Sequence, residues 1–240
     1  MILSADCSQH PLYKPAIPPK MTWMKCSPCG HVFTEGYFTQ EALALIFSDA
    51  NENQKAGFDI ENQRFVSARM IEKVLPYAHD GYWLDIGFGN GSLLFTADEF
   101  GFKAVGVDLR KENVDLMKSI GFEAYCADVN VLEGSNRFSV VSMADVLEHM
   151  PYPGSSLESV YRLLRSDGVL LLSMPNMDST LWKALDNNNA NPYWGELEHY
   201  HNFGRTRLFG LLREKGFEPV RFGISERYRA CMEIVARKAG

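Results

Sequence analysis

The stretch Tyr82–Ser92, which reads YWLDIGFGNGS, decides the fold of this chain. Its first five residues are aromatic or branched except for Asp85, and this is the composition of a short buried strand. A tight turn follows, with glycine at every second position: Gly87, Gly89 and Gly91. An amphipathic run then begins at Leu93. Strand, glycine turn and helix start form the first half of a nucleotide-binding βαβ unit, because glycine tolerates positive φ and lets a ligand approach the backbone.

The spacing of these glycines differs from that of dinucleotide-binding proteins. Their fingerprint is G-x-G-x-x-G, whereas here the third glycine comes one position early and Ser92 stands in its place. The turn therefore suits a nucleoside ligand, and its details count against a nicotinamide dinucleotide. A plain βα turn without any ligand is the remaining alternative.

The composition describes an acidic globular protein. With 240 residues, 46% of them hydrophobic, we expect one α/β domain with a small appendage. The net charge of −6 counts against unspecific nucleic-acid binding. The start, MILSADCSQH, does not resemble a secretory signal, and no apolar run approaches the length of a membrane span. We therefore expect a cytoplasmic protein in which the five cysteines are free thiols or metal ligands.

Strands and helices alternate after the glycine turn. Short apolar runs predict four further strands before residue 174 and two closing strands: Lys103–Val107, Phe122–Cys126, Phe138–Met143, Val169–Ser173, Phe217–Phe222 and Ala230–Ala236. Periodic segments between them predict helices. This alternation is typical of a doubly wound, mostly parallel α/β sheet.

Three acids stand at or next to the ends of successive predicted strands: Asp85, Asp108 and Asp128. In a parallel sheet these ends meet at one edge, which is the ligand site of such folds. Asp108 follows Gly91 by 17 residues, near the ~20 expected for an acid that accepts from a ribose hydroxyl. A single acid at a strand end is usually a helix cap, but three beside this turn predict a nucleoside site.

Two helices are expected before the first strand, within a segment that we bound at residues 38–76. Thr39 can cap a helix that runs to about Asp49, and a second helix covers roughly Ile60–Leu75 before Pro76. These helices could dock on the sheet or cover the ligand, and their sequence favours docking. The main domain is then predicted over residues 77–240.

Residues 1–37 are predicted to form a small zinc-knuckle-like head. Two pairs of candidate ligands, C-x-x-H and C-x-x-C, are spaced as in a structural zinc site: Cys7, His10, Cys26 and Cys29. His31 is an alternative to His10. The competing interpretation is that Cys26 and Cys29 are free thiols in a loop.

At this point the sequence resembles the class I S-adenosylmethionine-dependent methyltransferases, over about residues 60–240. DIGFGNG (85–91) looks like their glycine motif, VGVDL (105–109) like their ribose-binding segment, and YCADV (125–129) like their adenine-binding segment. The D-V-L-E-H run at 145–149 is similar to small-molecule methyltransferases of the ubiquinone-biosynthesis type. The resemblance implies a Rossmann-like sheet of seven strands with an antiparallel last strand.

The resemblance also implies which residues hold the cofactor. Asp108 would accept from both ribose hydroxyls, and Asp128 would meet the adenine amino group. The full set implied for S-adenosylmethionine, and for S-adenosylhomocysteine as product, is Asp85, Gly87, Phe88, Gly89, Asn90, Gly91, Asp108, Leu109, Asp128, Val129, Ala144 and Asp145. Because the transferred methyl group is already activated, the enzyme mainly aligns donor and acceptor.

The segment 191–203, NPYWGELEHYHNF, follows the fifth strand, where this fold inserts acceptor-binding residues. We expect four titratable side chains to converge on the methyl group and to act as catalytic groups: His149, Glu198, His199 and His201. His199 or His201 is favoured as a base over His149, which could instead orient a loop. The alternative is a packing loop with capped histidines.

The predicted function is methyl transfer to a small-molecule acceptor, such as a sugar or another metabolite, without nucleic-acid or membrane partners. A nicotinamide-dependent oxidoreductase and a non-catalytic nucleoside-binding adaptor are the alternatives. The sequence indicates neither the acceptor, nor whether oxygen, nitrogen or carbon is methylated, nor the oligomeric state.

Overall fold

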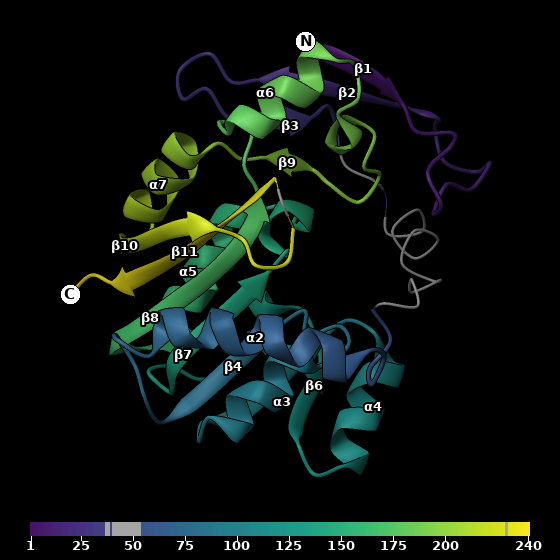
Figure 1. Ribbon diagram of the computed structural model, residues 1–240. Coiled ribbons are helices and arrows are strands. Elements are labelled where there is room, and N and C mark those ends of the chain that lie inside the picture. Colours follow the sequence, from purple (N-terminus) through teal and green to yellow (C-terminus); the bar gives the residue numbers. More distant parts are fainter. Residues whose placement is uncertain (37–38, 40–53, 229) are drawn as a thin grey trace.

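The computed structural model (Figure 1) describes residues 1–36, 39, 54–228 and 230–240. The helix predicted from Thr39 to Asp49 lies outside this described part except for its first residue. None of the described helices is both long enough and apolar enough to cross a membrane.

A seven-stranded sheet forms the centre of the molecule, with strand order β10-β11-β8-β7-β4-β5-β6. Its strands are β4 (Tyr82–Ile86), β5 (Lys103–Asp108), β6 (Glu123–Cys126), β7 (Phe138–Ala144), β8 (Leu164–Pro175), β10 (Phe217–Ile224) and β11 (Cys231–Lys238). β4 pairs in parallel with β5 and β7, and β11 runs antiparallel to both β8 and β10. The predicted α/β, mostly parallel seven-stranded sheet with an antiparallel closing strand is therefore confirmed.

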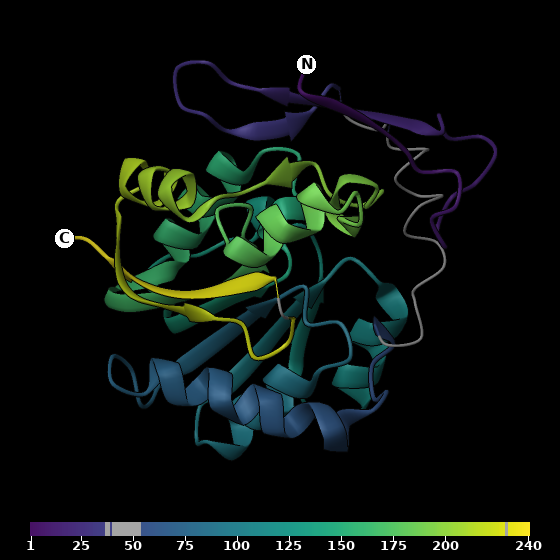
Figure 2. The same ribbon diagram turned by 45° about the horizontal axis from the view of Figure 1, so that its top comes forward.

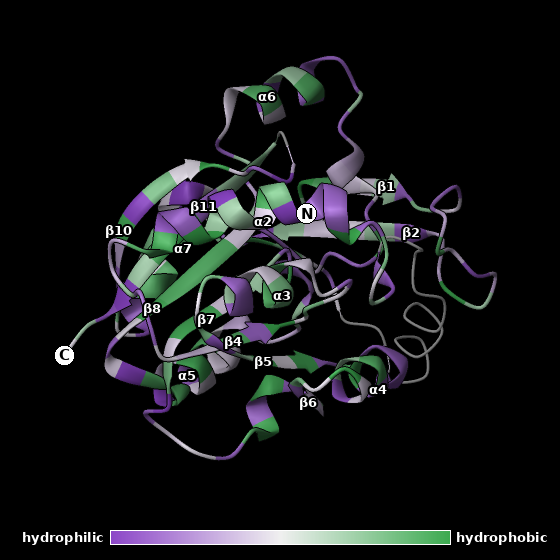
Figure 3. Ribbon diagram, turned by 60° about the horizontal axis from the view of Figure 1, so that its bottom comes forward, coloured by the Kyte–Doolittle hydropathy of each residue, from purple (hydrophilic) through white to green (hydrophobic). Residues whose placement is uncertain are grey.

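Helices cover both faces of this sheet, because successive strand residues point to opposite sides. On one face lie α2 (Ile60–Val74), α3 (Ser92–Glu99) and α4 (Lys111–Ser119), whose apolar side chains share a core with Trp83 and Leu171. On the other face, α5 (Pro153–Leu163) and α7 (Arg205–Glu214) pack on Val141 and Leu172. Helix α2 is thus docked on the sheet, as its sequence favoured. Strand β8, buried between these layers, is hydrophobic along much of its length (Figure 3).

The first 36 residues form a small antiparallel sheet instead of an irregular knuckle. Its strands β1 (Leu3–Asp6), β2 (Lys20–Lys25) and β3 (Val32–Thr34) are joined by β9 (His201–Asn202) from the far end of the chain. The Trp23 indole donates to the Trp194 carbonyl at 2.8 Å. Figure 2 shows the head lying above the segment that carries β9 and α6 (Thr180–Asn187). The head is therefore attached to the segment 191–203, in which acceptor-binding residues are predicted.

Candidate cofactor and acceptor site

The glycine turn between β4 and α3 adopts backbone angles that favour glycine, with φ of 53° at Gly89 and 84° at Gly91. A Cβ on Gly91 would lie 2.4 Å from the Met117 Cε and 3.0 Å from the Phe95 Cε2, so both side chains would have to shift to admit it. A Cβ on Gly89 would meet nothing closer than the Gly87 carbonyl oxygen at 3.9 Å. The turn therefore leaves an open surface at Gly89, where a ligand can approach the backbone.

Asp108 ends β5 directly beside this open surface. One of its carboxylate oxygens accepts from the Gly89 amide at 3.1 Å, and the other accepts from the Arg110 amide at 2.8 Å. Each carboxylate oxygen has two lone pairs and so keeps one beyond these amides. The Arg110 guanidinium also lies 3.8 Å from one oxygen, and Asp108 is 3% exposed. The next residue, Leu109, is 67% exposed and offers an apolar surface at the same edge. This pairing of an acceptor carboxylate with an exposed apolar side chain suits a ribose and its base.

Asp85 lies deeper, in the sheet. Its carboxylate accepts from the Ser142 hydroxyl at 2.6 Å. Burial raises the pKa of Asp85 to about 7, although the Ser142 hydrogen bond and the charge of Arg227 act in the opposite direction. The carboxyl therefore keeps its proton over much of the acidic pH range. Its hydrogen bond with Ser142 connects β4 to β7.

Asp128 caps the short helix Val129–Val131 that follows β6. One carboxylate oxygen accepts from the Asn130 backbone amide at 2.7 Å and from the Asn130 side chain at 2.8 Å. Val129, the next residue, is buried. Asp128 therefore combines the ordinary capping role of a strand-end acid with a position next to the predicted adenine site.

Asp145, one residue beyond Ala144 at the end of β7, has a positive φ of 58°. The Ser173 hydroxyl donates to its carboxylate at 3.0 Å, and the Arg227 guanidinium lies 3.2 Å from it. Arg227 lies between the two closing strands predicted from the sequence and was not among the predicted site residues. Nothing local in the sequence links Arg227 to an acid that precedes it by 82 positions.

Two of the four predicted acceptor-side residues meet. The imidazole rings of His149 and His199 lie with their centroids 4.7 Å apart, nearly perpendicular to each other. Glu148, which was not predicted, joins them: one ligand-type atom from each of the three side chains lies within 4.8 Å of the others. His149 Nδ1 is 3.0 Å from the Glu198 carbonyl oxygen. Glu148 and His149 follow Asp145 by three and four residues, and His199 reaches them from the segment 191–203 to complete a polar group.

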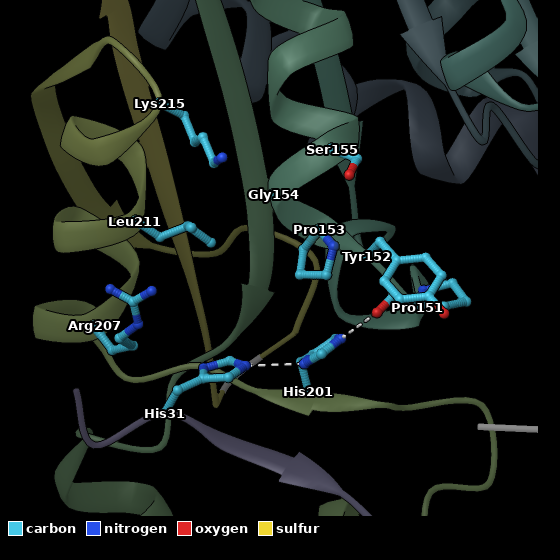
Figure 4. A pocket seen from close by; sticks show the side chains of 10 residues that line it. All are labelled: His31, Pro151, Tyr152, Pro153, Gly154, Ser155, His201, Arg207, Leu211 and Lys215. Carbon is cyan, nitrogen blue, oxygen red and sulfur yellow. Dashed lines mark hydrogen bonds between the residues drawn. The ribbon is translucent and has the colours of Figure 1, made fainter. Parts of the chain in front are cut away.

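Glu198 and His201 do not contribute atoms to this group. Burial raises the pKa of Glu198, and the nearby His149 acts in the opposite direction. His201 Nδ1 lies 2.9 Å from His31 Nε2, and its Nε2 lies 3.4 Å from the Pro151 carbonyl oxygen. Both imidazoles line a separate surface pocket with Arg207 and other residues of α5 and α7 (Figure 4). Burial lowers the pKa of His201 to about 4 and that of His31 to about 3. The expectation that all four groups converge is therefore wrong for His201. This residue lies in β9, which pairs with β3 of the head, so its side chain contacts the head instead.

The head does not assemble the predicted zinc ligands. Cys7 is buried in the apolar core of the head, and His10 pairs instead with Glu196 at 2.6 Å. The Cys26 and Cys29 thiols remain neighbours, and hydrogen bonds from the His31 backbone and Cys26 lower the pKa of Cys29. In the described part of the chain, the group Glu148, His149 and His199 is the one set of three or more candidate ligands whose atoms converge. A single tetrahedral site built from Cys7, His10, Cys26 and Cys29 therefore does not form in this structure.

A family model described as a methyltransferase domain matches residues 59–221. The chain therefore belongs to the methyltransferase-domain family, and its fold is that of the class I S-adenosylmethionine-dependent methyltransferases. The match favours neither the nicotinamide oxidoreductase nor the non-catalytic adaptor.

Two relatives are ubiquinone biosynthesis O-methyltransferases. That of Colwellia psychrerythraea is 27% identical over 106 residues, which cover 41% of this chain and 43% of the relative. That of Caulobacter vibrioides is 29% identical over 101 residues, which cover 39% and 40%. The match therefore spans less than half of the length of these relatives.

A solved structure shows the same fold over almost the whole chain. It is the 1,6-didemethyltoxoflavin-N1-methyltransferase of Burkholderia thailandensis with bound 1,6-didemethyltoxoflavin and S-adenosylhomocysteine. The identity is 21% and the TM-score 0.65, and the alignment covers 92% of this chain and 99% of that one. The 8% of this chain that the alignment leaves uncovered is shorter than the head, so the alignment includes at least part of the head as well as the large sheet.

Proposed function

We propose that this protein transfers the methyl group of S-adenosylmethionine to a small-molecule acceptor. The observation that carries the proposal is the Asp108 carboxylate, which is held by the Gly89 amide of the open glycine turn and by the Arg110 amide, and which keeps lone pairs for a ribose. When bound, S-adenosylmethionine supplies an activated methyl group on a sulfonium, whose leaving group is a neutral thioether. What the chain must add is alignment of the acceptor and removal of its proton.

Each part of the cofactor has a matching group at this edge of the sheet. Asp108 accepts from the ribose hydroxyls, Leu109 packs against the base, and Asp128 offers an oxygen to the adenine amino group. The Gly89 region lies against the ligand's central portion. Asp145, fixed by Arg227, holds the end of β7 in place beside the methionine portion.

The acceptor is proposed to bind next to the group Glu148, His149 and His199. These side chains follow strand β7, whose carboxyl end abuts the ligand in such sheets. Both relatives named above are O-methyltransferases, which supports a hydroxyl-bearing acceptor. Loss of the hydroxyl proton is then assisted by this group, and His199 is the favoured residue because it comes from the acceptor-side segment 191–203.

The test is a calorimetric titration of the purified protein with S-adenosylhomocysteine and, separately, with NAD. We expect saturable binding of S-adenosylhomocysteine at one site and no heat with NAD. Binding of NAD without binding of S-adenosylhomocysteine would contradict this proposal and favour a nicotinamide-dependent oxidoreductase.

A further inference from the structure

We propose that Glu148, His149 and His199 bind one divalent transition-metal ion of the Zn²⁺ class. Each of the three side chains contributes one candidate ligand atom, and these atoms lie within 4.8 Å of one another. A single ion can therefore contact all three after a shift of the side chains by a fraction of that distance. Nothing in the methyl transfer itself requires this ion.

The first argument is the state of Glu148. Its side chain is 1% exposed, and neither carboxylate oxygen accepts a hydrogen bond from another residue in the described part of the chain. A buried carboxylate in this state is costly, and such groups are normally paired or coordinate a metal. The neighbouring Asp145 is already neutralised by Arg227. Arg227, the cation that acts on Glu148 from nearby, is thus already engaged by Asp145.

The second argument is how the imidazoles are held. His149 Nδ1 lies 3.0 Å from the Glu198 carbonyl oxygen, which cannot donate, so this nitrogen carries the proton and Nε2 keeps a lone pair. Donation of one ring nitrogen to a backbone carbonyl is the usual way in which a metal-binding histidine is oriented. His199 is 6% exposed, and none of the described residues forms a hydrogen bond with its Nδ1. Both rings therefore have a nitrogen available for a ligand.

The third argument is the donor set. Two imidazoles and one carboxylate form the set of several catalytic zinc sites, which keep a further position open. Such a mixture disfavours Mg²⁺ and Ca²⁺, which prefer oxygen ligands throughout. If the proposed function holds, the open position receives an oxygen or nitrogen of the acceptor. In the metal-bound protein His199 then assists proton loss only by holding the ion, which lowers the pKa of the bound acceptor, and does not itself accept the proton. The metal site itself does not depend on that function.

The probe is Co²⁺, whose visible absorption reports its ligands. The full-length protein, stripped with a chelator, is titrated with Co²⁺ and then with Zn²⁺ as a competitor. We expect one Co²⁺ per chain, displaced by Zn²⁺, and a loss of affinity on the order of 100-fold or more in Glu148→Gln and in His199→Gln. Glu196→Gln, which changes a glutamate of the same segment that pairs with His10, should bind Co²⁺ like the wild type.

The thiols of the head are the competing site, and they are tested in the same titration. Cys26→Ser with Cys29→Ser should leave the Co²⁺ spectrum unchanged. Loss of the spectrum in this double variant, or full binding by a folded Glu148→Gln protein, overturns the proposal. Circular dichroism confirms that the variants fold. Binding of S-adenosylhomocysteine by the stripped protein is measured in parallel, so that failure of the metal site is distinguished from failure of the methyltransferase function.

Discussion

The Arg227 guanidinium lies 3.2 Å from the Asp145 carboxylate and so connects the β10–β11 hairpin to the end of β7. Arg227 also donates to the Ala144 carbonyl at 3.4 Å. Asp145 is 16% exposed in its side chain, which leaves the carboxylate little water to replace this partner. The ion pair thus holds two segments that the fold brings together at the cofactor edge.

Replacing Arg227 by Met should destabilise the protein and weaken cofactor binding. The Asp145 carboxylate loses a charged partner, which corresponds to about 1–3 kcal/mol. Urea unfolding with and without S-adenosylhomocysteine measures both effects. Arg221→Met, on the exposed face of β10, is the control and should leave both quantities near those of the wild type. Equal behaviour of the two variants would contradict the role of the Arg227–Asp145 pair.

Asp85 should make stability fall as the pH rises. Its pKa is raised from 3.8 to about 7, so between these values the folded state holds a proton that the unfolded state has released. The stabilisation from this proton is full below pH 4 and is lost as the pH approaches 7. The free energy of unfolding of the wild type, minus that of Asp85→Asn, should therefore decrease over this range, on the order of 1 kcal/mol per pH unit. A difference that increases with pH would have the wrong sign.

The two histidines of the segment 191–203 should respond differently to mutation. His199→Ala removes a member of the acceptor-side group, so methyl transfer should fall by about 100-fold or more while the affinity for S-adenosylhomocysteine stays unchanged. His201→Ala should keep the transfer rate and lower the melting temperature, because His201 contacts His31 and the Pro151 carbonyl instead. A rate measurement on both variants decides this, and an inactive but stably folded His201→Ala protein would restore the original expectation.

Alanine substitutions at two glycines of the same turn should have different effects, one mainly on stability and the other mainly on ligand binding. Gly91→Ala places a Cβ 2.4 Å from the Met117 Cε at φ 84°, so the free energy of unfolding should drop by about 1–3 kcal/mol. Gly89→Ala points a Cβ into the open surface at φ 53°, which costs roughly 1 kcal/mol but obstructs the ligand. Affinity for S-adenosylhomocysteine should therefore fall more in Gly89→Ala. Thermal unfolding and calorimetry together give both numbers.

Much of the fold was predictable because its signals are local. One βαβ unit contains the strand with Asp85, the alternating glycines and the acid at Asp108. Within such a unit, the spacing of residues along the chain indicates which of them lie close together in the fold. The same holds for the alternation that predicts the doubly wound sheet. The seventh, antiparallel strand came from the family resemblance and was confirmed.

The remaining features depend on contacts between distant residues. His10 pairs with Glu196, which follows it by 186 positions, and this partner removes it from the predicted zinc site. His201 joins the head through Phe33, whereas His199, two residues earlier, stays with His149. Ligand spacing along the chain contains no information about such partners. Glu148 was part of a recognised motif, but its burial without a partner is visible only in the folded structure.

The central claim is that Asp108 holds the ribose of S-adenosylmethionine, and the most direct test is the dissociation constant of S-adenosylhomocysteine for Asp108→Ala. Loss of hydrogen bonds to a charged group corresponds to about 1.5–3 kcal/mol, or an increase in the dissociation constant of about 10- to 150-fold. Asp98→Ala, which changes an exposed acid on α3, should bind like the wild type. An unchanged dissociation constant in Asp108→Ala would contradict the account.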